Sequence, residues 1–64
     1  MEKELEIIRQ MFALLNMKAF CEKYSLPYDY TRKVLKGDFP LTLDFRDRII
    51  EQFQNFERDF KKNI

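Results

Sequence analysis

Five basic side chains lie close together in residues 17–37, and they are the side chains best suited to chemistry with a charged partner. They are Lys18, Lys23, Arg32, Lys33 and Lys36. Only Glu22 and Asp29 oppose them, so this stretch carries a net charge of +3, whereas residues 1–16 and residues 38–64 each carry −1. Ammonium and guanidinium groups donate hydrogen bonds to anionic oxygens such as those of phosphate. The chain is nearly neutral as a whole, but its positive charge is gathered in one segment.

The signals along this segment predict two short helices joined by a tight turn. Asn16 is suited to cap a helix from Met17 to Tyr24, because its side chain can accept from the free amides of the first turn. Ser25-Leu26-Pro27 forms the turn, and a second helix extends from Pro27 to Lys36. Gly37 supplies a left-handed residue that ends this helix. Helices joined by so short a turn cross steeply, as in a helix-turn-helix over residues 17–37.

Helical periodicity continues on both sides of this unit. It predicts a helix from Glu2 to Leu15 and a long helix from Leu43 to about Lys61, with Thr42 as the cap of the second. Sixty-four residues with one Gly and two Pro leave room for a single domain, residues 1–64. We therefore expect an all-α fold, a small bundle of about four helices with a central helix-turn-helix.

One apolar residue set should form the core that joins all four helices. Its members are Phe12, Phe20, Leu26, Val34, Phe45 and Ile49. Cys21 and Thr31 should face inward where the two short helices cross, and Ala19 should lie on the inner side of the first. Phe39 and Leu41 should lie beneath the core in the loop after Gly37.

The first helix carries a core stripe of Leu5, Ile8, Phe12 and Leu15, and a second apolar stripe of Ile7, Met11 and Leu14 accompanies it. Either it widens one buried face or it contacts another subunit. The last helix continues its own apolar stripe to Phe56 and Phe60, about two turns beyond Phe53, where a compact core should end. These phenylalanines either fold back on the first helix or pair with a second copy. We expect a homodimer, with Ile7, Met11, Phe56 and Phe60 in its interface.

Groups for catalysis or metal binding are few. The chain has no His, no Gly-rich phosphate loop and one Cys, so we expect no enzyme, no cofactor and no metal site. The acidic start Met1-Glu-Lys-Glu-Leu-Glu is unlike a signal peptide, and no apolar run approaches the ~20 residues of a membrane span. We expect a cytoplasmic protein that does not associate with membranes.

Residues 10–53 resemble the lambda repressor-like helix-turn-helix family, the Cro and XRE type. In that family a helix of the pattern L-A-x-x-x-G-V-S precedes a recognition helix that ends in Gly. Here Phe20 to Pro27 matches the first pattern, with Cys21 at the small Ala and Leu26 at the Val. Val34 falls on an inward apolar position and Gly37 on the terminal Gly. Ser25 replaces the turn glycine and Pro27 replaces the usual Ser or Thr cap.

The resemblance implies a small sequence-specific DNA-binding transcriptional regulator of the phage or mobile-element type. It places Tyr28, Asp29, Arg32 and Lys33 against base edges in the major groove of double-stranded DNA. It places Lys18 and Lys36 on phosphates. The near-neutral total charge, the acidic Asp38 loop and the aromatic side chains favour an alternative. This alternative is a helix-turn-helix-derived protein-interaction module, a small phage-type inhibitor or adaptor that does not bind DNA.

Overall fold

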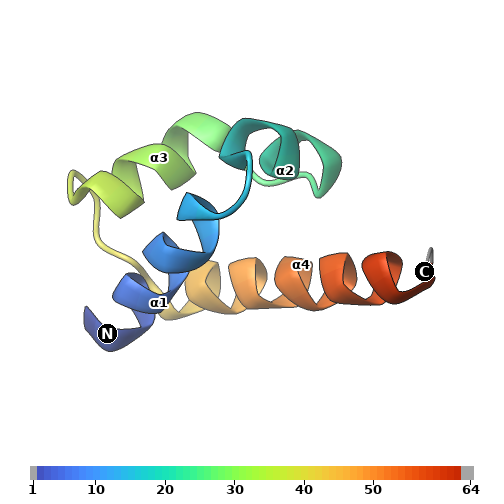
Figure 1. Cartoon of the computed structure of the whole chain (residues 1–64). Coiled ribbons are helices and arrows are strands. Elements are labelled where there is room, and N and C mark those ends of the chain that lie inside the picture. The colour runs from blue at the N-terminus through green and yellow to red at the C-terminus, as the bar shows by residue number, and fades with distance from the viewer. Residues whose placement is uncertain (1, 63–64) are drawn as a thin grey trace.

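The computed structural model describes residues 2–62, which form four helices and no strand. The helices are α1 (Glu2–Ala13), α2 (Met17–Lys23), α3 (Tyr28–Lys36) and α4 (Leu43–Lys62). In Figure 1, α4 lies along one side, α1 crosses its first half, and α2 and α3 cover the opposite side. The expected all-α bundle of four helices around a central helix-turn-helix is confirmed. None of the helices in residues 2–62 is long and apolar enough to cross a membrane.

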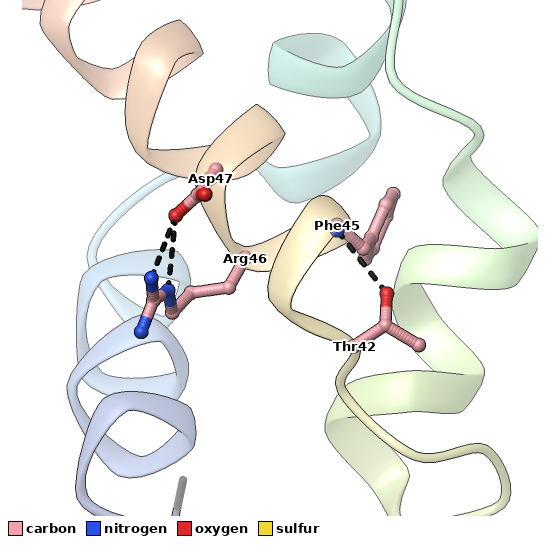
Figure 2. Close-up of polar contacts among 4 residues, drawn as sticks. All are labelled: Thr42, Phe45, Arg46 and Asp47. Atoms are coloured by element: carbon pink, nitrogen blue, oxygen red, sulfur yellow. Dashed lines mark hydrogen bonds and ion pairs between the residues drawn. The ribbon is translucent and has the colours of Figure 1, made fainter.

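The helix ends follow from local hydrogen bonds. The side chain of Asn16 accepts from the amide of Ala19 at 3.1 Å and so caps α2. The hydroxyl of Thr42 accepts from the amide of Phe45 at 3.2 Å and caps α4 in the same way (Figure 2). Beside this cap, the guanidinium of Arg46 donates to Asp47 at 2.9 and 3.1 Å. Both predicted caps are confirmed, and they set where α2 and α4 begin.

Four helix boundaries differ from the expected ones. The first helix ends at Ala13 because Leu14 and Leu15 turn away in a tighter bend, in which each amide donates to the carbonyl three residues earlier. This bend frees Asn16 to adopt the extended backbone of a cap. Pro27 is the residue before α3, and the helix itself begins at Tyr28. In addition, α2 ends one residue early, at Lys23, and α4 ends one residue late, at Lys62. All four differences are of one or two residues, as is usual at helix ends.

The predicted core is confirmed. All six of its members are buried, together with Ile8, Cys21, Leu41, Phe53 and Thr31. Phe20 lies at its centre, because its ring lies within 6 Å, centroid to centroid, of four other aromatic rings, those of Phe12, Tyr24, Phe53 and Phe56. These rings pack tilted or edge to face, which is the favoured arrangement of aromatic pairs. One aromatic cluster therefore joins α1, α2 and α4.

Two residues expected inside lie outside. Ala19 is exposed, because the inner face of the seven-residue α2 is occupied by Phe20 and Cys21. Phe39 is 42% exposed and its ring stacks on Tyr30, whereas Leu41 of the same loop is buried. Leu5 and Leu15, the outer members of the predicted core stripe of α1, are only partly buried.

Apolar packing continues along α4 beyond the fully buried core. The last buried residue of α4 is Phe53, as expected, and the partly buried Phe56 packs against this core, next to Phe20 and Tyr24. The hydroxyl of Tyr24 donates to the carboxylate of Asp59 at 2.9 Å. Partial burial, followed by this contact with Asp59, raises the pKa of Tyr24 above its usual range. These contacts connect the second half of α4 to α2 within one chain.

Candidate nucleic-acid interface

The turn between α2 and α3 contains one left-handed residue and is held by two hydrogen bonds. Ser25 has a left-handed backbone with φ of 59°, which glycine would adopt at lower cost. The amide of Leu26 donates to the carbonyl of Cys21 at 2.9 Å and closes the end of α2. From α4, the guanidinium of Arg48 donates to the carbonyl of Ser25 at 2.8 Å. The strained turn is therefore stabilised both by its own backbone and by α4.

The end of α3 has the same backbone motif. Gly37 adopts φ of 100°, and the amide of Asp38 donates to the carbonyl of Lys33 at 2.9 Å. From α1, the Nε of Arg9 donates to the carbonyl of Leu35 at 2.7 Å. A guanidinium at this position also interacts favourably with the negative end of the helix dipole. The left-handed cap at Gly37 is confirmed, and α3 is fixed at both of its ends.

The inner side of α3 is fully buried. Val34 and Thr31 have no exposed surface, and the Thr31 hydroxyl donates to the carbonyl of Pro27 at 2.7 Å. Cys21 of α2 packs at the same crossing and is 1% exposed. Burial raises the pKa of its thiol, which opposes any role as a nucleophile. The inward positions predicted for Cys21 and Thr31 are confirmed.

The outer side of α3 carries the predicted base-contacting residues, with different exposures. Asp29, Arg32 and Lys36 are exposed, and their spacing of three and four residues places them on one face of the helix. Tyr28 is half-buried because its ring packs against the core. Lys33 was expected to be exposed and is half-buried, since its ammonium lies 5.8 Å from the centre of the Phe39 ring.

The basic side chains of the helix-turn-helix have no acidic partners. Salt bridges join Arg9 to Glu6 on α1, and Arg46 to Asp47, Arg58 to Asp59 and Lys61 to Glu57 on α4. In contrast, Lys18, Lys23, Arg32, Lys33 and Lys36 form no salt bridge with any residue in the range 2–62. The positive charge of this surface is therefore free to meet an anionic partner.

An exposed aromatic pair lies beside this basic face. The rings of Tyr30 and Phe39 stack at 5.6 Å with an angle of 20° between their planes. Tyr30 also packs edge to face on Phe45 at 4.9 Å, so the pair is attached to the core. No site was predicted at these two residues. The available signal was an aromatic residue, Phe39, two positions after the Gly37 cap.

The four residues predicted for a dimer interface line one groove between α1 and α4. Its volume is about 500 Å³, and Ile7, Met11, Phe56 and Phe60 all contribute to it. Ile7, Met11 and Leu14 are exposed, so the second stripe of α1 is not part of one wide buried face. Ile50 of α4, which was not among the predicted interface residues, lines the same groove and is also exposed.

No protein-family model matches this chain, and no curated protein or solved structure matches it either. The resemblance to the lambda repressor-like family therefore rests on the sequence motif and stays a prediction.

Proposed function

We propose that this protein is a small DNA-binding transcriptional regulator that binds double-stranded DNA through α2 and α3. The observation that carries the proposal is the set of five basic side chains on this unit that have no acidic partner among residues 2–62. Proteins gain most of their nonspecific DNA affinity by neutralising phosphates with such cations. A helix-turn-helix with an exposed second helix is one of the units that enter the major groove.

Each residue predicted to contact DNA has a role in this proposal. Arg32 donates to O6 and N7 of guanine, and Asp29 accepts from N4 of cytosine. Lys33 reaches a guanine from a position restricted by the Phe39 ring, and Tyr28 touches a thymine methyl or a phosphate at the rim. Lys18 and Lys36 contact phosphates and orient the protein without reading sequence.

A homodimer is part of the proposal. One recognition helix makes few base contacts, and specific sites for such units are paired half-sites read by two copies. A pair of copies related by a two-fold axis would present two α3 helices with a fixed separation. The exposed apolar side chains of α1 and α4 supply a surface through which two chains can associate.

Replacing Lys36 by alanine should weaken binding to all DNA sequences alike. The loss of one phosphate contact should reduce the slope of log affinity against log salt concentration by roughly 0.9 per bound chain. Fluorescence anisotropy with a labelled random-sequence duplex measures this slope. Lys3→Ala is the matched control, because Lys3 is exposed on α1 and lies outside the basic unit. Equal slopes for wild type and Lys36→Ala would contradict the phosphate role of Lys36.

A second candidate function is supported by the exposed Tyr30–Phe39 pair. A protein-interaction module that does not bind DNA would use an aromatic surface of this kind as an anchor for a partner. Asp38, next to Phe39, would repel a DNA backbone that approached this loop. In this alternative, Phe39→Ala abolishes binding to a protein partner, and Lys36→Ala has no effect on DNA because no DNA complex forms.

A further inference from the structure

The groove between α1 and α4 is an apolar surface that no other part of residues 2–62 covers. On the α1 side it is formed by Ile7 and Met11, and on the α4 side by Ile50 and Phe60. All four side chains are exposed, and Phe60 is exposed by 58%. A continuous apolar surface of this kind marks a site of association, whereas single exposed apolar residues are ordinary.

The positions of Ile50 and Phe60 allow this groove to bind the same groove of a second chain. They are ten residues apart on α4, which is about 15 Å along the helix. If a second α4 packs against the first in the antiparallel direction, with a two-fold axis near residue 55, Phe60 of each chain lies opposite Ile50 of the other. Ile7 and Met11 then flank each inserted Phe60 ring. The same contact forms twice, as a symmetric interface requires.

The charges at the two ends of the groove also favour antiparallel packing of the two α4 helices. Residues 2–6 at the start of α1 carry a net charge of −2, with Glu2, Glu4 and Glu6 opposed by Lys3 alone. Residues 57–62 at the end of α4 carry +1 and terminate in Lys61 and Lys62. Antiparallel packing brings the basic end of each α4 next to the acidic start of the other chain's α1. Parallel packing would place the two basic ends beside each other.

We propose that a second copy of this chain binds in the α1–α4 groove, with the two α4 helices antiparallel and each Phe60 inserted between Ile7 and Ile50 of the other chain. This inference rests on the homodimer of the proposed function and defines its geometry. A standard interface buries about 800 Å² on each partner. That is about one sixth of the 4787 Å² surface of this chain, so polar residues at the rim, such as Gln54 and Glu57, must also take part.

Sedimentation equilibrium at high micromolar concentration and without DNA tests the site. Wild type should have twice the chain mass of 7.9 kDa. Phe60→Glu should have the mass of one chain while circular dichroism shows unchanged helicity, because Phe60 is exposed. Leu43→Glu is the matched control, since Leu43 is equally exposed at 58% on the same helix but lies outside the groove. It should remain a dimer.

A wild-type protein that sediments as a single chain would overturn the proposal. So would a Phe60→Glu variant that stays dimeric, or a Leu43→Glu variant that becomes monomeric. Because DNA is absent, none of these outcomes bears on whether a single chain binds DNA. A dimer that binds no DNA would contradict the proposed function alone.

The direction of packing is tested by a spin label on Lys62→Cys, with Cys21 left in place because it is buried. In the antiparallel dimer the two labels are seven residues from the axis on opposite sides. They should be about 20 Å or more apart, from the helix rise alone. Packing in the parallel direction would place them roughly one interhelical spacing apart, about 10 Å, and that shorter distance would overturn the antiparallel arrangement.

Discussion

Replacing Phe20 by alanine should leave most of the protein unfolded at room temperature. Phe20 is 6% exposed, and its ring contacts aromatic rings from α1, α2 and α4. Removing a buried phenylalanine costs about 3–5 kcal/mol in the free energy of unfolding. A domain of this size has a total of roughly 3–10 kcal/mol at the usual stability per residue. The loss is therefore comparable with the whole stability of the fold.

Thermal unfolding followed by circular dichroism at 222 nm, a helix signal, measures this effect. Leu14→Ala is the control, because Leu14 is 87% exposed in the bend after α1 and its replacement should change the free energy of unfolding by less than about 0.5 kcal/mol. A folded Phe20→Ala protein with the wild-type melting temperature would contradict the assignment of Phe20 to the centre of the core.

Replacing Arg32 by alanine should have the largest effect on DNA sequence choice. Arg32 is exposed on α3 and has no acidic partner among residues 2–62, so its guanidinium is free to form two parallel hydrogen bonds to guanine. We expect a loss of about 1–3 kcal/mol at a preferred site, and relaxed selection at the base pair that Arg32 contacts. Selection from a random duplex library, followed by titration of the preferred site, gives both quantities.

Arg32→Lys separates base reading from charge. Lysine keeps the positive charge but lacks the planar fork that binds guanine at two positions. Affinity for random DNA should stay close to that of wild type, while preference for the selected site should fall. If Arg32→Ala leaves the selected sequence unchanged, Arg32 does not read bases and the orientation of α3 in the groove is wrong.

The helix ends could be predicted because the signals for them are local. Asn16, Thr42 and Gly37 each act within four residues of their own position, through a side-chain oxygen or a permitted left-handed backbone. The core could be predicted for a similar reason, since apolar residues at helical spacing must share one face. The buried Val34 and Ile49 are examples.

The remaining features depend on how the helices cross, which periodicity does not encode. Phe56 packs against the core because α2 lies over the second half of α4 and brings Phe20 and Tyr24 to it. Phe39 is exposed and stacks on Tyr30, whereas Leu41, two residues further along the same loop, is buried. The contact between Arg9 and the carbonyl of Leu35 joins residues 26 positions apart, and no pattern in the sequence signals it.

The central claim, that this protein binds DNA through its basic helix-turn-helix, is tested most directly by titrating wild type against a random-sequence duplex at 50 and 200 mM salt. If each chain contacts phosphates through Lys18 and Lys36, affinity should fall about 10-fold over this range for a single chain and about 100-fold for a dimer. No binding at 50 mM salt, or binding that does not change with salt, would contradict the account.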